Sequence, residues 1–241
     1  LWRDEAGDAA LRHAVDLSPS PASLEKVTTR FVQGEYSEAE SLAKESVNKN
    51  PRDVYAALLL ARIAIHAKVY EDAERILREI IKIAPRFIVA WHDLGATLKE
   101  QGKEEEATST LKEALKIDEN NALTHYLYAA SLALAGQTET AAPYYKNAVQ
   151  IQPSLVGAHV GLGHVLKTLG DQEGGIASYR AAIALRPNLG EIYFSLSNLK
   201  PFRFTYDEIE DMVQSLSQES LDSESIVHFS FSLGTAFEYK K

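Results

Sequence analysis

Small and large apolar residues recur along the chain with a period of 34 residues. Four of the eight prolines mark this period: Pro51, Pro85, Pro153 and Pro187. The missing member of the series falls at Glu119. With Val54 as position 1 of a unit, position 8 is Ala, Gly or Ser in five successive units, and position 7 is Leu or Tyr. Such a period is typical of stacked helix-turn-helix units that contact only their neighbours.

The columns of this repeat predict two antiparallel helices in each unit. Positions 8 and 20 hold small residues where the two helices approach closely, and positions 7 and 24 hold large residues that fill the space between successive helices. Gly102, Gly136 and Gly170 occupy position 15, where a glycine with positive φ ends the first helix, and Lys68 interrupts this column. Proline then ends each second helix. The pattern therefore predicts an all-α fold.

These residues resemble the signature of the tetratricopeptide-repeat family. The resemblance is clearest in one unit, at Trp91, Leu94, Gly95, Leu98, Ala107, Leu111 and Ala114. It implies a right-handed superhelical solenoid of antiparallel helix pairs, with four regular repeats over residues 54–189. Residues 1–53 are expected to hold a half-repeat with a helix at about 9–17 and a degenerate first unit whose first helix lies around 21–33. Residues 190–241 are expected to hold an atypical unit and the first helix of a further repeat.

The end of the chain departs from the regular pattern. Lys200 and Pro201 predict an early end to the helix that begins at Gly190. Thr205 and Glu208 form a capping-box pattern, which predicts a helix to about residue 217 in the place of a second helix. A further helix is expected over 224–241, with Leu233, Gly234 and Phe237 at positions 7, 8 and 11.

Residues 198–238 also resemble the segment that precedes the catalytic domain in bacterial tetratricopeptide-repeat sulfotransferases. The resemblance lies in the runs 198–209 and 228–238. It implies an alternative function, as the substrate-presenting or regulatory N-terminal region of such an enzyme, with its own downstream catalytic domain as a partner. No strand followed by a phosphate-binding loop is present in this sequence, so the chain itself is not expected to be an enzyme. A third alternative is an oligomerisation scaffold.

Composition narrows the possible partners. The net charge of -9 and the absence of a basic stripe argue against nucleic acid. Without cysteine, the chain can form neither disulfides nor thiolate metal sites. The most nearly uncharged stretch, residues 120–142, contains too many polar residues to cross a membrane. No signal-peptide pattern opens the sequence, and a cytoplasmic location is the default expectation.

Few residues suggest chemistry. Gly161 and Gly163 lie within a predicted helix and follow no strand, so packing explains them better than phosphate binding. His125 and His159 recur at the position of Trp91, which indicates packing between repeats rather than a metal site. Neither a cofactor nor a metal is expected.

Binding is instead expected on the first helices of the units. Family geometry directs positions 2, 5, 9, 12 and 13 into a concave groove. The candidate groove residues are Tyr55, Leu58, Arg62, His66, His92, Lys99, Tyr126, His164, Lys167, Phe194 and Asn198. This mixed apolar and aromatic set suits a peptide or protein surface, with Arg62, Lys99 and Lys167 offered to acidic side chains. The alternative is that Tyr55, Tyr126 and Phe194 only pack against neighbouring first helices.

Overall fold

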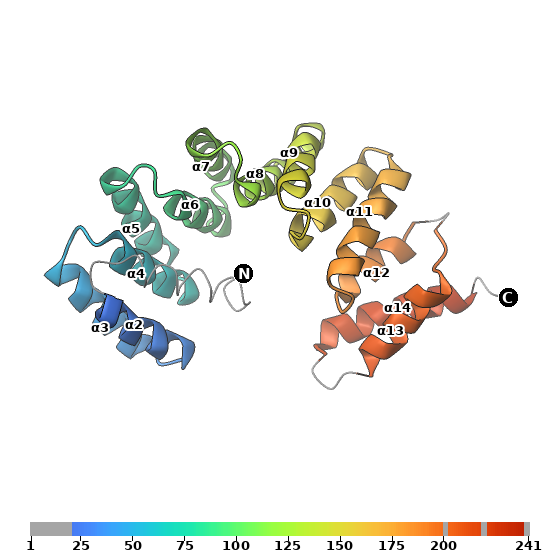
Figure 1. Cartoon of the computed structure of the whole chain (residues 1–241), viewed down its shortest axis with the longest axis horizontal. Coiled ribbons are helices and arrows are strands. Elements are labelled where there is room, and N and C mark those ends of the chain that lie inside the picture. The colour runs from blue at the N-terminus through green and yellow to red at the C-terminus, as the bar shows by residue number, and fades with distance from the viewer. Residues whose placement is uncertain (1–20, 200–201, 218–220, 239–241) are drawn as a thin grey trace. The chain divides into compact units, whose positions relative to one another are not determined.

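The described part of the chain is entirely helical. The computed structural model describes residues 21–199, 202–217 and 221–238, which form thirteen α-helices and no strand (Figure 1). They belong to two compact units, one ending at Glu119 and one beginning at Asn120. The helix predicted at about 9–17 lies outside the described residues, as do the last residues of the helix predicted over 224–241.

The described residues of unit 1 form three helix pairs. They are α2 (Pro21–Val32) with α3 (Tyr36–Lys49), α4 (Val54–His66) with α5 (Tyr70–Ile83), and α6 (Ile88–Glu100) with α7 (Glu104–Ile117). We call the first helix of each pair an A helix and the second a B helix. Each A helix packs on its own B helix, and α3 and α5 also pack on the A helix that follows them. The A helices α2, α4 and α6 contact one another in sequence, so A and B helices form separate layers.

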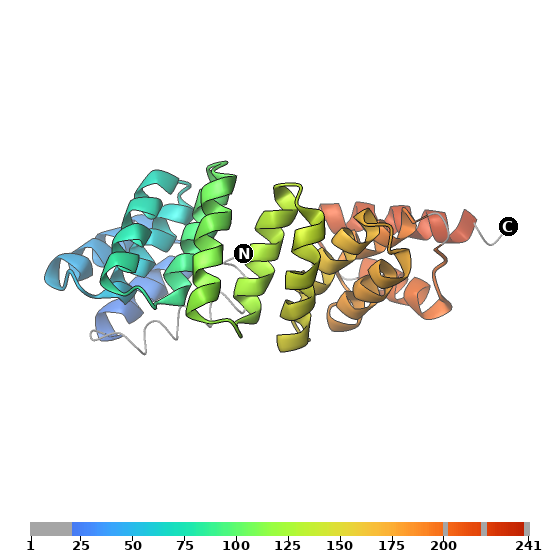
Figure 2. The same ribbon diagram turned by 90° about the horizontal axis from the view of Figure 1, so that it is seen from above.

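Unit 2 begins with two more pairs of the same kind. They are α8 (Ala122–Leu134) with α9 (Thr138–Ile151), and α10 (Val156–Thr168) with α11 (Gln172–Leu185), followed by α12 (Gly190–Ser197), α13 (Tyr206–Leu216) and α14 (Ser223–Glu238). Figure 2 shows the paired helices of each unit side by side. From α4 to α11, every A helix begins at position 1 of the 34-residue period and every B helix at position 17.

The turns between A and B helices have the predicted backbone geometry. Gly34, Gly102, Gly136 and Gly170 have φ values of 82°, 73°, 75° and 86°. Lys68 occupies the same place between α4 and α5 with φ of 61°, the one non-glycine residue of the described chain in this region. An L-residue other than glycine adopts this conformation at a steric cost, so this turn is strained relative to the others.

Small residues at position 8 allow the B helix to approach. A Cβ atom added at Gly95 would lie 2.8 Å from the side chain of Leu111, and one added at Gly163 would lie 2.6 Å from the ring of Tyr179. An added Cβ at Gly161 would collide with the ring of Tyr145. These glycines therefore serve packing, as the sequence predicted, because the large residue at position 24 of the B helix fills the space.

The predicted early end of α12 and capping box of α13 are present, but the last three helices pack differently from the regular repeats. Helix α12 ends early, and Thr205 and Glu208 form both hydrogen bonds of a capping box at the start of α13. The expectation that α13 would take the place of a B helix is wrong, since the main partner of α12 is α14. Gly190 lies against Ser225 and His228 of α14, and Phe194, four residues later, lies against His228 and Phe231. Helices α12 and α14 are therefore parallel.

Candidate functional site

One face of the A helices in unit 2 carries a row of apolar side chains at position 5. The row, here called the position-5 stripe, consists of Tyr126, Val160, Phe194 and Phe231, from α8, α10, α12 and α14. All four residues are at least partly exposed, and Phe231 is 50% exposed. We call the surface formed by these residues and their neighbours at positions 2, 9 and 12 the A face of unit 2.

Contacts between neighbouring helices hold the stripe in place. The hydroxyl of Tyr126 lies 3.0 Å from where a Cβ of Gly157 would be, so this ring lies directly on the backbone of α10. The ring of Phe194 stacks on His228 at 4.9 Å between centroids and meets Phe231 edge-on at 5.1 Å. The predicted groove residues Tyr126 and Phe194 thus pack on neighbouring helices and still keep part of their surface exposed.

Polar groups border the stripe. Nδ1 of His164 lies 2.7 Å from the hydroxyl of Tyr179, which also bonds Ser195 on α12. Partial desolvation against Tyr179 and the nearby Lys167 lower the pKa of His164, which keeps this ring neutral at pH 7. Asn198 donates a hydrogen bond to the backbone oxygen of Phe194 at 2.8 Å. The border therefore offers neutral hydrogen-bonding groups, the cation Lys167, and the exposed carboxylates of Glu191 and Glu238 at positions 2 and 12.

His228 and Phe231 were missing from the predicted groove residues. The signal that could have found them was present in the sequence, because Leu233 and Gly234 were assigned to positions 7 and 8 of a further repeat. In that register His228 is position 2 and Phe231 is position 5, which are two of the five columns of the predicted groove. The structure brings both side chains against Phe194, at the end of the stripe.

In unit 1 the corresponding residues are largely interior. Leu58, Arg62 and His92 are buried, at 1%, 4% and 7% exposure, so their prediction as accessible groove residues is wrong. Nε of Arg62 lies 2.8 Å from Oδ2 of the buried Asp93, which joins α4 to α6. Burial lowers the pKa of His92 to about 4, so its ring is neutral at pH 7.

The remaining unit 1 candidates differ in their surroundings. Tyr55 is partly buried and meets Phe87 edge-on at 5.2 Å between ring centroids. His66 is exposed and stacks on Tyr36 at 4.1 Å. Lys99 is exposed. These three residues do not form a row comparable to the position-5 stripe.

Family models of the tetratricopeptide repeat match the chain at residues 31–98, 88–121 and 156–189. Together they cover residues 31–121 and 156–189, just over half of the 241 residues. The chain belongs to the tetratricopeptide-repeat (TPR) family. Proteins of this family generally mediate protein–protein interactions, and their repeats typically form a non-catalytic scaffold.

Solved TPR structures share the fold of this chain at low sequence identity. A structure of MamA from Desulfovibrio magneticus RS-1 is 17% identical with a TM-score of 0.60, over 73% of this chain and 97% of that one. The thermophilic TPR protein TTC0263 from Thermus thermophilus is 20% identical with a TM-score of 0.58, over 71% and 93%. YrrB, a TPR protein with an unusual peptide-binding site, is 16% identical with a TM-score of 0.56, over 78% and 97%. No curated protein matches the sequence.

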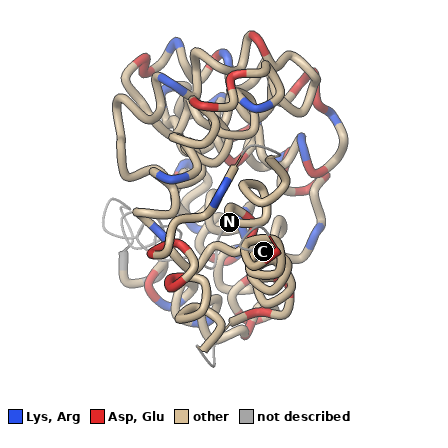
Figure 3. Tube along the Cα trace, turned by 90° about the vertical axis from the view of Figure 1, so that its right-hand side faces the viewer, with Lys and Arg blue, Asp and Glu red and all other residues tan. Residues whose placement is uncertain are grey.

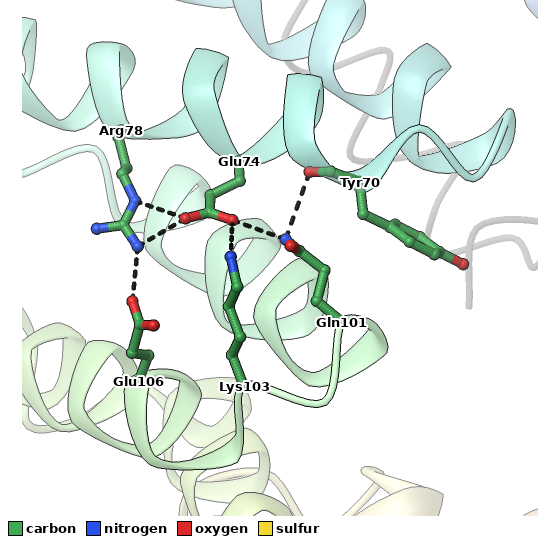
Figure 4. Close-up of polar contacts among 6 residues, drawn as sticks. All are labelled: Tyr70, Glu74, Arg78, Gln101, Lys103 and Glu106. Atoms are coloured by element: carbon green, nitrogen blue, oxygen red, sulfur yellow. Dashed lines mark hydrogen bonds and ion pairs between the residues drawn. The ribbon is translucent and has the colours of Figure 1, made fainter.

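The best-connected polar cluster of this TPR chain joins two repeats of unit 1 (Figure 4). Glu74 on α5 accepts hydrogen bonds from Lys103 at 2.7 Å, from Gln101 at 2.8 Å and from Arg78, which also binds Glu106 on α7. Partial burial raises the pKa of Glu74, but these hydrogen bonds outweigh it and lower the pKa to about 2. The cluster is an inter-repeat clamp, because every charged group in it faces an opposite charge.

The described residues give little support for a charged binding surface, a metal site or a membrane-spanning helix. Acidic and basic positions are interspersed along the chain rather than gathered by sign (Figure 3). Within the described ranges, no group of three or more His, Asp or Glu side chains could hold a metal ion. None of the helices described is both long and apolar enough to cross a membrane.

Proposed function

We propose that the A face of unit 2 binds a peptide segment of a partner protein. The observation that carries the proposal is the position-5 stripe, in which Tyr126, Phe194 and Phe231 keep exposed aromatic surface on α8, α12 and α14. Aromatic side chains that are fixed by packing lose little conformational entropy on binding and are common anchors of protein interfaces. Peptide binding is also named for YrrB, a protein of similar fold.

The surroundings of the stripe suggest the chemistry of the peptide. Apolar side chains would cover the rings of Phe194 and Phe231, and hydrogen bonds from the peptide would reach His164 and Asn198. Lys167 is half-buried beside the stripe, where it would pair with an acidic side chain of the peptide. An apolar peptide that offers a carboxylate to Lys167 and places no acidic side chain beside Glu191 is therefore the preferred ligand.

Selection from a library of random peptides displayed on phage would test this proposal. We expect selected peptides to lose at least about tenfold in affinity for the variants Tyr126→Ala, Phe194→Ala and Phe231→Ala, because each truncation removes a buried aromatic contact. The variant Tyr206→Ala is the matched control, since Tyr206 is 80% exposed on α13 and lies outside the A face. Circular dichroism would check that each variant is folded.

Selected peptides that bind the three A-face variants and the control with equal affinity would contradict the proposal. Tyr55, His66 and Lys99 would then be the next residues to test, since their role in a unit 1 groove stays a prediction. The alternative in which this region serves a sulfotransferase domain also stays a prediction, and no contact in the structure favours it over peptide binding.

A further inference from the structure

Helix α14 exposes a second apolar surface that lies outside the A face. It consists of Val227, Ser230, Gly234 and Phe237, which are three or four residues apart and so share one side of the helix. Val227 is 64% exposed and Phe237 is 51% exposed. A Cβ atom added at Gly234 would meet no described atom within 4 Å. We call this surface the B-docking face.

The repeat register shows what such a surface holds elsewhere in the chain. Val227, Ser230, Gly234 and Phe237 are positions 1, 4, 8 and 11 of a repeat. In the regular repeats position 8 is buried by the B helix of the same unit, as Leu111 fills the space beside Gly95 and Tyr179 the space beside Gly163. The equivalent space beside Gly234 is open. The B-docking face therefore has the shape that accepts a B helix.

The helices that fill this space in the regular repeats share one pattern. Position 20 is Ala or Gly, position 24 is Leu or Tyr, and position 27 is Ala or Ile, and all three are buried in α5, α7, α9 and α11. Gly175 at position 20 lies against Gly163 and Lys167 of α10, and Tyr179 at position 24 lies against Gly163. The short turn between Thr168 and Gln172 makes these paired A and B helices antiparallel. The pattern defines the chemistry of a matching helix.

We propose that the B-docking face binds an amphipathic α-helix of a partner protein that carries this small-x-x-x-Leu/Tyr-x-x-Ala/Ile pattern. The helix lies antiparallel to α14, with its Leu or Tyr beside Gly234. A second copy of the chain cannot supply it from the described residues, because α5, α7, α9 and α11 each bury their pattern within their own repeat. This binding is independent of the peptide proposed for the A face.

A synthetic helix with the sequence of residues 102–118 is a suitable probe. It contains the pattern of α7, Ala107, Leu111 and Ala114, and a lactam bridge between Glu105 and a lysine placed by Ser109→Lys would stabilise the helix on its exposed side. Fluorescence anisotropy of the labelled peptide with the full chain should show saturable binding. We expect a loss of at least about tenfold for the peptide variant Leu111→Glu.

Two variants of the chain separate this site from the A face. Gly234→Leu fills the space where the helix docks, and we expect at least about tenfold weaker peptide binding. The melting temperature should not fall, because no described residue lies within 4 Å of a Cβ at that position. Phe231→Ala should leave binding of this probe unchanged. Absence of saturable binding, or binding that survives Gly234→Leu, would overturn the proposal. Dimerisation of the chain that Gly234→Leu abolishes would also overturn it, in favour of a second copy.

Discussion

The Glu74 clamp makes a prediction about the pH dependence of stability in unit 1. The variant Glu74→Gln keeps the shape of the side chain but removes the charge that Lys103 and Arg78 face. The pKa of about 2, against an ordinary value of 4.5, corresponds to roughly 3 kcal/mol of stabilisation by the ionised form. The side chains of Arg78 and Lys103 are 45% and 38% exposed, so solvent screens part of this stabilisation. We therefore expect Glu74→Gln to lower the free energy of unfolding by about 1–2 kcal/mol at neutral pH.

The sign of the pH dependence follows from the lowered pKa of Glu74. A carboxylate with a lower pKa in the folded state stabilises the fold fully above its unfolded pKa, and this contribution is lost as the pH falls from about 4.5 towards 2. Urea unfolding of the parent chain and of Glu74→Gln should therefore give curves that converge on acidification. We expect the difference in unfolding free energy of about 1–2 kcal/mol to shrink by about 60–80% between about pH 6 and pH 3.5.

An exposed ion pair provides the matched control. Glu113 and Lys116 lie 2.6 Å apart on α7, with 46% and 65% of their side chains exposed. Glu113→Gln should change stability by less than about 0.5 kcal/mol at any pH. If Glu74→Gln costs no more than Glu113→Gln, or if its cost is the same at both pH values, the argument from the clamp is refuted.

Four further variants test turns and packing. Lys68→Gly should raise the unfolding free energy by about 0.5–1 kcal/mol because it relieves the positive φ, and Gly102→Lys should lower it by about 1 kcal/mol, both measured by urea unfolding. Tyr193→Phe should be neutral or raise the melting temperature, since its buried hydroxyl has no hydrogen-bond partner among the described residues. Gly163→Leu should lower the unfolding free energy by about 1–3 kcal/mol because the ring of Tyr179 occupies the space, and an unchanged melting temperature would contradict this packing.

The helix pairs and turns could be predicted from sequence because each depends on a single residue type at a fixed repeat position. Glycine at position 15 permits a positive φ, and Lys68 adopts the same geometry because the helices on both sides of it demand it. Small residues at position 8 predict the close approach of a B helix, and this prediction does not depend on the rest of the fold. Local capping chemistry predicted the start of α13 at Thr205 in the same way.

Side-chain pairing between repeats could not be predicted in this way. Arg62 and Asp93 are 31 residues apart, which places them on neighbouring A helices, but the sequence gives no sign that the pair is buried. The sequence therefore predicts Arg62 only as a cation of the groove. Glu106 lies in the acidic first turn of α7, and nothing in the sequence indicates that it binds Arg78 of the preceding repeat. Such pairings depend on the angle between helices, which the repeat period does not specify.

The helix that packs on α12 also could not be predicted from the sequence. The signals at Thr205 and Glu208 specify where a helix begins, whereas packing depends on the length of chain between helices. Proline at position 201 ends the repeat register, so the next helix is no longer constrained to lie where a B helix would. Helix α14 contacts α12 instead, which extends the A face by His228 and Phe231.

The two units use the same groove positions for different purposes, and this explains why the candidate site lies in unit 2. A buried charge such as that of Arg62 requires an opposite charge, and Asp93 supplies it, so these positions in unit 1 serve stability. In unit 2 the equivalent position is the exposed His164, and position 5 carries aromatic rings that retain exposed surface. Substitutions at Leu58 or Asp93 should therefore change stability, whereas substitutions at Phe231 should change binding.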